Sequence, residues 1–314
     1  MMKIEELTLE KYPVRFSSHK KKKFLLELDE VFQEEGYPVV ADEKRSFRGK
    51  TRNRMYAYEK TAKLYIAVPY DTPQRLFWYK SEYYPLDGNR SLNKSMLATY
   101  VPALVLYGLI LLFILFVSPN MQDLVLKAAA NLAVAAATIL LMWLLFHGIG
   151  NRKNANRNSS SIIAAVRFMK TLNNDQKRRI GFVFVDRCDQ SCLGAKLLSA
   201  YFADKKKNPD IIWLDCVGVG DTIGIGYRTH GKRLASTIHA KKKQESVQLS
   251  EMGGDQCLRS VMSCFDKAVM ISAGEIDAKG SLLVKDTQRS TDRVIDDKNI
   301  EKILALLQEA IPRK

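Results

Sequence analysis

The sequence lacks the cysteine patterns of secreted and of zinc-finger proteins. Its five cysteines are odd in number and include no CxxC pair. They are Cys188, Cys192, Cys216, Cys257 and Cys264. A reducing compartment fits this usage best. The start of the chain carries acidic residues instead of an early apolar run, so we expect no cleavable signal peptide.

The sequence also lacks the mixture of aromatic and basic residues that is typical of nucleic-acid binding. It is basic overall, with 49 Lys and Arg against 34 Asp and Glu and a net charge of +15. The lysines form short runs at residues 20–23, 205–207 and 241–243. We therefore expect no nucleic-acid partner, and we interpret the runs as solvated faces or as loops beside an anionic membrane.

Charge is absent from two long apolar runs, residues 96–118 and 128–148. As a helix the first run is about 34 Å long, which is enough to cross a hydrocarbon layer of about 30 Å. The second is weaker because it contains Asn131, but its many alanines favour close packing on the first. The alternative is a hairpin buried in a protein core. We predict a transmembrane hairpin over residues 96–148.

Basic residues flank this pair of runs and are scarce between them. They are Lys80, Arg90 and Lys94 before the pair, Arg152, Lys153 and Arg157 after it, and only Lys127 between the runs. The positive-inside rule then places both flanks in the cytoplasm. We expect a two-pass protein of the cell membrane whose flanks, residues 1–95 and 149–314, form one soluble domain.

Outside the hairpin, apolar periodicity alternates between helical and extended. Helices are predicted at residues 20–36, 159–172, 190–203, 256–266 and 297–311. Strands are predicted at residues 37–41, 53–58, 63–68, 179–186, 211–215, 268–272 and 281–285. This alternation predicts a three-layer α/β/α sandwich with a mixed, mostly parallel sheet. The glycine-rich stretch 218–226 lacks the Lys-Ser/Thr of a phosphate loop and is interpreted as a turn.

Acidic residues follow several of the predicted strands. They are Asp71, Asp186, Asp189, Asp215 and Asp286. One such acid is usually a turn or helix-cap residue. Because parallel strands end at one edge of a sheet, where ligand sites gather, the repeated pattern favours a single site.

Five sequence words, in order, resemble those of the di-zinc aminopeptidases of metallopeptidase family 28. The words are AVPYDT at 67–72, RNSSSIIAAVRFMKTL at 157–172, GFVFVDRCDQSCLGAKLL at 181–198, WLDCVG at 213–218 and DTQRSTDRVID at 286–296. The family also includes glutaminyl cyclase and the non-catalytic ectodomain of the transferrin receptor. The resemblance covers most of the soluble chain and implies the family's fold.

The resemblance also implies where the family's metal ligands would lie, and most are replaced. The first zinc-binding His corresponds to Pro69, although the Asp that accompanies it is kept as Asp71. The bridging aspartate corresponds to Arg157, a permanent cation. An Asp ligand is kept as Asp215, and the last His ligand corresponds to Asp286.

The two remaining positions lie side by side in the third word. The general-base Glu corresponds to Cys188, and the neighbouring ligand Glu is shortened to Asp189. A zinc hydrolase needs a metal to activate water and a carboxylate to take the proton. We therefore expect no zinc or other cofactor, no catalytic residue, and a membrane-anchored pseudopeptidase that binds or scaffolds an unknown protein or peptide.

The alternative is an active membrane-bound hydrolase with a rebuilt site. Cys188 would act as a nucleophile with His230 or His239 as its base. A second version places a hard cation among four acids, namely Asp71, Asp189, Asp215 and Asp286.

The side chain of Arg157 is the subject of a further prediction. A guanidinium can bind carboxylates in place of a metal, so we expect Arg157 within about 4 Å of Asp189, Asp215 or Asp286. The alternative is that Arg157 points to solvent or to lipid headgroups.

Overall fold

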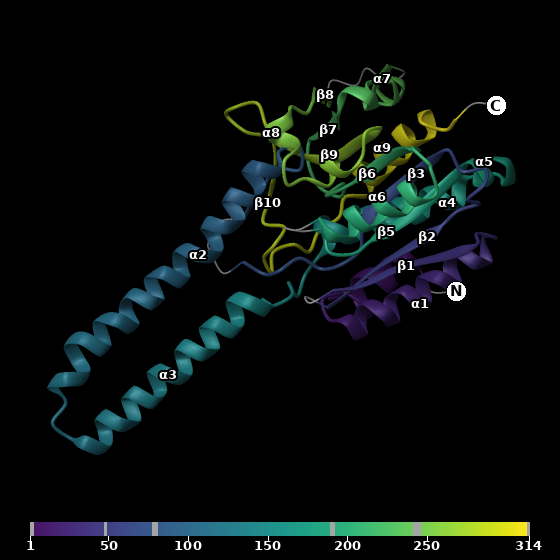
Figure 1. Ribbon diagram of the computed structural model, residues 1–314. Helices are drawn as coiled ribbons and strands as arrows, with labels where there is room; N and C mark the ends of the chain where they lie inside the picture. The colour runs from purple at the N-terminus through teal and green to yellow at the C-terminus, as the bar shows by residue number, and fades with distance from the viewer. Residues whose placement is uncertain (1–2, 47–48, 77–80, 189–191, 241–245, 313–314) are drawn as a thin grey trace.

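The structure is a computed structural model that describes residues 3–46, 49–76, 81–188, 192–240 and 246–312. Its centre is a mixed sheet, ordered β1-β2-β5-β3-β6-β9-β10-β4, with β7 also joined to β9 and β8 joined to β7. The parallel centre consists of β5 (Ile180–Val185), β3 (Leu64–Pro69), β6 (Asp210–Leu214) and β9 (Ala268–Ile276). Figure 1 shows helices on both sides of this sheet.

Antiparallel strands extend the parallel centre on both sides. On one side are β1 (Val39–Ser46) and β2 (Gly49–Tyr56). On the other are β7 (Thr222–Tyr227), β10 (Leu282–Lys285) and β4 (Glu82–Tyr83), while β8 (Val247–Glu251) pairs in parallel with β7. Strands from before and after the apolar hairpin are thus hydrogen-bonded in one sheet.

Both faces of the sheet are covered by helices. One face packs against α1 (Ser18–Glu34), α4 (Ser160–Thr171), α7 (Lys232–Ala240) and α9 (Asp297–Glu309). The other packs against α6 (Leu193–Asp204) and the short α8 (Gly254–Cys257). In β3, Ile66 and Val68 face the first layer, whereas Tyr65 and Ala67 face the second. Successive side chains of a strand point to opposite faces. Because helices cover both faces of this sheet, β3 is apolar at every position. The predicted three-layer α/β/α class is confirmed.

Two local predictions were wrong. The glycine-rich stretch is not all turn, because residues 222–227 form β7. The side chain of Leu86 packs against Gly224 and Gly226. A Cβ at either glycine would lie within 3.0 Å of it. The helix expected at 256–266 is broken at Arg259, whose φ of 63° lies in the left-handed region. Unpredicted elements include α5 (Asn174–Arg179), α7 and β8.

The apolar hairpin projects from the sandwich at the lower left of Figure 1. Its helices are α2 (Gly88–Leu112), which continues as helical turns to Asn120, and α3 (Leu124–His147). Both are long and apolar enough to cross a membrane, and no residue of α3 is buried. The hairpin is therefore not part of the core.

The first helix begins earlier than the predicted span, on the soluble domain itself. Asp87 caps it by accepting a hydrogen bond from the Arg90 N–H at 2.9 Å. Arg90 pairs with Asp277 at 2.7 Å, and Lys94 pairs with Glu82 at 2.6 Å. The polar residues 88–95 thus attach α2 to the domain before the apolar run starts.

Gly194 provides a test of the packing between β5 and α6. A Cβ at this position would lie 1.9 Å from the Asp186 carbonyl oxygen and 2.7 Å from Val185 Cγ1. Gly194→Ala should lower the free energy of unfolding by about 1–3 kcal/mol, because the backbone of β5 would have to move. The measurement is denaturant unfolding of the detergent-solubilised chain.

Gly254→Ala is the matched control, since a Cβ there meets nothing within 4 Å. It should change the free energy of unfolding by less than about 0.5 kcal/mol. Equal losses for the two variants would contradict the close approach at Gly194.

Candidate functional site

Arg157 forms a buried ion pair with Asp215. Arg157 lies in the helical turn Ala155–Ser159 that precedes α4, and Asp215 follows β6. Arg157 Nη1 is 3.2 Å from Asp215 Oδ1 and 3.4 Å from Oδ2. The two side chains are only 7% and 6% exposed. The prediction that Arg157 lies within about 4 Å of one of the named aspartates is confirmed for Asp215.

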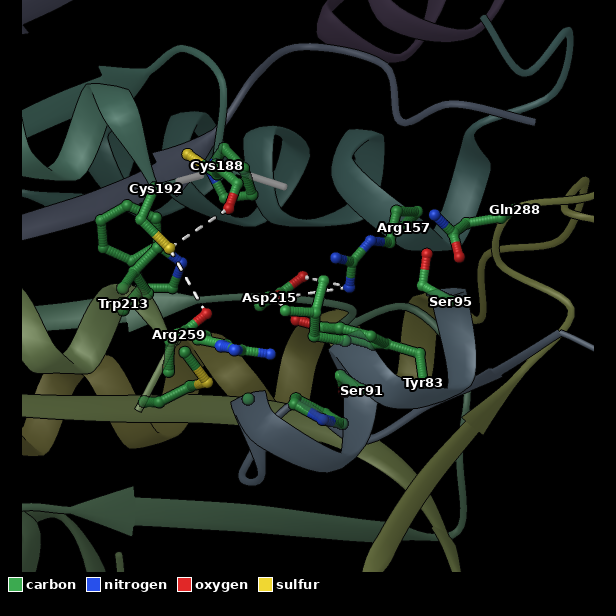
Figure 2. Close-up of a pocket in the computed structure, with 17 residues that line it drawn as sticks. Tyr83, Ser91, Ser95, Arg157, Cys188, Cys192, Trp213, Asp215, Arg259 and Gln288 are labelled. Atoms are coloured by element: carbon green, nitrogen blue, oxygen red, sulfur yellow. Dashed lines mark hydrogen bonds and ion pairs between the residues drawn. The ribbon is translucent and has the colours of Figure 1, made fainter. Parts of the chain in front are cut away.

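Tyr83 of β4 contacts both members of this pair, as Figure 2 shows. Its hydroxyl donates to Asp215 Oδ2 at 2.5 Å, and its ring centroid lies 3.4 Å from the guanidinium carbon of Arg157. Burial raises the pKa of Tyr83 well above its usual value, so the hydroxyl remains a donor. The ring gives Arg157 a cation–π contact away from water. The sequence offered no signal for Tyr83, because β4 is too short to show periodicity.

Asp292 holds the backbone of the turn that carries Arg157. Its carboxylate accepts hydrogen bonds from the N–H of Asn156 at 2.6 Å and of Arg157 at 3.2 Å. Burial raises the pKa of Asp292 to about 7, against the lowering effect of these hydrogen bonds and of the Arg157 charge. Asp292 is within the sequence word 286–296, but its spacing there gave no indication of this role.

A small cavity lies beside the pair. Its volume is about 70 Å³, and four of the predicted site positions line it, namely Pro69, Arg157, Cys188 and Asp215. Residues 88–95 of α2 form another wall, through Gly88, Ser91, Leu92 and Ser95. Pockets for drug-sized ligands usually measure about 300–1,000 Å³. The cavity is therefore far too small for a peptide.

The remaining predicted positions do not join this cluster within the described chain. Asp286 is partly exposed and pairs with Arg289 at 3.3 Å, and Asp71 lies on the α1 side. Asp189 is outside the described residues. The described strand-end acids are balanced by different cations, Arg157 for Asp215, Arg289 for Asp286 and Lys21 for both Asp71 and Asp186, so they do not form the single carboxylate site that we expected.

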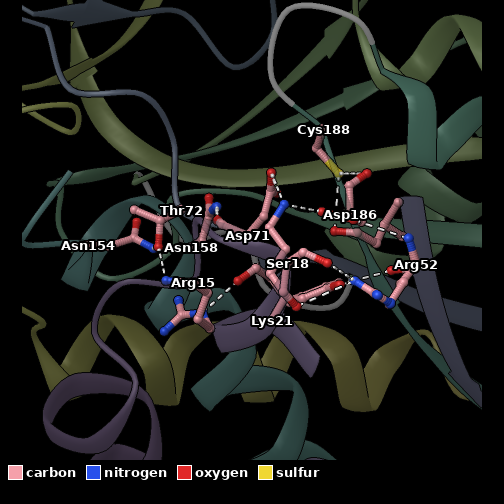
Figure 3. A network of polar contacts seen from close by, with 12 residues as sticks. Arg15, Ser18, Lys21, Arg52, Asp71, Thr72, Asn154, Asn158, Asp186 and Cys188 are labelled. Atoms are coloured by element: carbon pink, nitrogen blue, oxygen red, sulfur yellow. Dashed lines mark hydrogen bonds and ion pairs between the residues drawn. The ribbon is translucent and has the colours of Figure 1, made fainter. Parts of the chain in front are cut away.

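Lys21 balances the acids beneath the cavity, in the network of Figure 3. Its Nζ is 2.5 Å from Asp186 Oδ1 and 3.6 Å from Asp71 Oδ2. Burial lowers the pKa of Lys21, but the two carboxylates outweigh burial and the pKa is raised overall. The prediction that residues 20–23 form a solvated face is wrong for Lys21. It shares the buried face of α1 with Phe24, Leu25 and Leu28, at helical spacing.

Arg15 is a second fully buried cation in the same network. It donates to the carbonyl oxygens of Tyr70 at 2.6 Å and Tyr12 at 2.6 Å, and to Ser159 Oγ at 3.0 Å. Burial lowers its pKa to about 10, against the raising effect of Asp71. Arg15 thus connects the first residues of the chain to the turn that holds Arg157.

The residues at this site do not fit a zinc pair. Pro69 has no donor atom, and the guanidinium of Arg157 lies against Asp215, where a second cation would be repelled. Among the residues that the structure describes, no group of three or more His, Cys, Asp or Glu is arranged to hold a metal ion.

For the cysteine version of the rebuilt site, the described part of the chain places no histidine base in the cavity. Cys188 is partly buried, and its thiol donates to the Val185 carbonyl oxygen at 3.5 Å. No described histidine lines the cavity. His239 belongs to α7, which packs on the opposite face of the sheet from Cys188.

Arg157→Met should lower the free energy of unfolding by about 3–5 kcal/mol, because it leaves Asp215 buried without a cation. The loss should shrink at acid pH, where a protonated carboxyl group needs no cation. Adding Asp215→Asn should restore about half of the loss, since neither charge then remains. Urea unfolding of the detergent-solubilised variants measures these differences.

The matched control is Arg167→Met on α4. Arg167 pairs with Glu5 and Asp297 but is 32% exposed, so its loss should be below about 1 kcal/mol. Equal losses at the two arginines, or no recovery in the double variant, would show that the Arg157 pair is not a buried one.

Comparison with known proteins shows which structures share the fold of this chain. No protein-family model and no curated protein matches the sequence. In structure, the chain is similar to a glutaminyl cyclase from Bacteroides thetaiotaomicron, at a TM-score of 0.60 and 14% identity over 99% of this chain and 95% of that one. The chain is also similar to a leucine aminopeptidase precursor from the same organism, at a TM-score of 0.57 and 14% identity over 99% of this chain and 94% of that one.

A third similar structure is a putative Zn-dependent exopeptidase from Bacteroides vulgatus, at a TM-score of 0.52 and 12% identity over 99% of this chain and 93% of that one. Identities this low show a shared fold, and the correspondence of single site positions stays a prediction. The chain has the fold of the aminopeptidase-like zinc exopeptidases and glutaminyl cyclases.

Proposed function

We propose that this protein is a membrane-anchored, catalytically inactive relative of the zinc aminopeptidases that binds or scaffolds a protein or peptide partner. The observation that carries the proposal is the buried pair of Arg157 and Asp215, at the position where the resemblance implies bridged zinc ions. A permanent cation there repels a divalent metal and cannot accept the proton of an attacking water.

An active hydrolase with a rebuilt site is the second candidate. It is favoured by one observation, the presence of the Cys188 thiol in the wall of the cavity. The geometry gives it little support, because the cavity of about 70 Å³ is narrow and residues 88–95 of α2 cover one side. A partner of peptide size would bind on the outer surface of the domain.

Membrane anchoring rests on the exposed hairpin and on the sheet. Lipid is the environment in which two helices with so many exposed apolar side chains are stable. Since strands from both sides of the hairpin share one sheet, the chain must cross the bilayer an even number of times. The basic residues at both ends of the hairpin favour a domain that faces the cytoplasm.

The purified full chain should contain no stoichiometric zinc and should hydrolyse no member of a panel of aminoacyl and peptide substrates. Chelators should leave its melting temperature unchanged, because a bound metal would raise stability by mass action. Elemental analysis, the substrate panel and thermal unfolding provide the measurements. Two zinc ions per chain, or turnover that is lost in Cys188→Ser, would overturn the inactive assignment.

Labelling with a membrane-impermeant maleimide should report the topology. In intact cells, Gln122→Cys should react from outside, because it lies in the turn between α2 and α3. Ala41→Cys and Lys298→Cys, both at exposed positions of the soluble domain, should react only after the cells are opened. External labelling at position 41 or 298 would contradict a cytoplasmic domain.

A further inference from the structure

The cavity beside Arg157 has a second cation in its wall, Arg259. Among the described lining residues with ionised side chains, Arg157 and Arg259 carry positive charge and Asp215 carries the one negative charge. Because Asp215 already pairs with Arg157, the charge of Arg259 has no counterpart among these residues. The described wall is therefore positive overall.

The backbone directs Arg259 into this space. Its φ of 63° is a left-handed conformation that a non-glycine side chain rarely adopts, and it separates α8 from the helical turn Val261–Cys264. In Figure 2 the Arg259 side chain extends toward Asp215 and Tyr83. No described carboxylate forms an ion pair with it. Arg259 is exposed, so the cavity has an open side.

Neutral donors line the opposite wall. Ser95 Oγ is a buried atom for which the described residues provide no hydrogen-bond partner. Gln288 lines the same cavity, and in the view of Figure 2 it is drawn on the same side as Ser95 and Arg157. Guanidinium, hydroxyl and amide groups together are the donors that proteins use to bind oxyanions.

The size of the cavity limits the ligand to a small group. A single water needs only about 10–15 Å³, so a cavity of about 70 Å³ has room for a group of a few heavy atoms. A phosphate group has five heavy atoms. We propose that this cavity binds a phosphate group between Arg259 and the wall formed by Arg157, Ser95 and Gln288.

The position of the cavity indicates the source of that phosphate. Its α2 wall ends at Ser95, and the apolar run of the first membrane helix starts at the next residue. On the membrane anchoring proposed above, Ser95 lies where the helix enters the headgroup layer. We assign the phosphate to a phospholipid headgroup, and soluble phosphate is the other source with the same chemistry.

The first experiment measures thermal unfolding of the full chain in detergent during titration with glycerol 3-phosphate and with inorganic phosphate. Both should raise the melting temperature to a plateau. Chloride and acetate at equal ionic strength should not, because they lack the phosphate oxygens. Absence of a plateau, or an equal rise with acetate, would overturn the phosphate site.

Arg259→Gln tests the residue that carries the proposal. It should weaken the apparent phosphate affinity at least about tenfold, as expected for the loss of a charged hydrogen bond. Its melting temperature without phosphate should stay close to that of the parent, because Arg259 is exposed. Arg259→Lys should retain part of the affinity. Unchanged phosphate affinity in Arg259→Gln would refute the site.

Arg233→Gln is the matched control. It removes the same charge from an exposed position on α7, which packs on the opposite face of the sheet. Phosphate affinity equal to that of the parent supports a local site. An equal loss in both variants would show that phosphate responds only to the overall positive charge, and would overturn the assignment.

The second arm separates the two sources by comparing short-chain phosphatidic acid with glycerol 3-phosphate. Stabilisation by the lipid at a lower concentration supports a headgroup ligand, whereas equal midpoints overturn the lipid assignment and leave a soluble phosphate site. The titrations with glycerol 3-phosphate and inorganic phosphate do not depend on membrane insertion. Failure of the labelling or zinc experiments therefore remains distinguishable from failure of the phosphate site.

Discussion

Carboxylates buried at the end of a parallel sheet need a positive charge beside them. Asp215 and Asp186 are both buried, and an isolated buried charge is strongly unfavourable. In this chain the neighbouring cations are side chains, Arg157 for Asp215 and Lys21 for Asp186. Each cation comes from a helical element and its carboxylate from the end of a strand, so the ion pairs also fix how α1 and the turn before α4 sit on the sheet.

The same interaction connects the site to the hairpin. Tyr83 contacts Asp215 and Arg157, and β4, which contains Tyr83, lies just before α2 in the chain. The first two turns of α2 form ion pairs with the domain and line the cavity. A change in the tilt of α2 would therefore move the wall of the cavity. If the hairpin anchors the domain and the cavity binds a ligand, as proposed above, the two functions are mechanically linked, which a flexible linker between domain and membrane would not provide.

How far the sequence predicts the structure depends on how local each signal is. The runs at residues 63–68 and 179–186 predicted the central strands. Their inner residues, 64–68 and 180–185, carry no charge because both faces of each strand are covered. β7 was missed because Gly224 and Gly226, which make room for neighbouring side chains such as Leu86, give the stretch the composition of a turn. The apolar residues that alternate with these glycines form only a short pattern. The buried state of Lys21 could have been found from its spacing to Phe24 and Leu28. The roles of Tyr83 and Asp292 depend on contacts between distant segments and could not.

An arginine in place of a metal, as we propose for this chain, changes what the site can respond to. A bound metal adds to stability only when it is present at sufficient concentration and when its ligands are deprotonated. An arginine is part of the chain and stays charged at any physiological pH, so the pair with Asp215 forms whenever the chain folds. On this proposal, the charge balance at the sheet edge does not depend on the supply of a metal. The described wall of the cavity then keeps a net positive charge, and under the proposals above that charge would suit an anionic ligand better than the metal-bound water of a hydrolase.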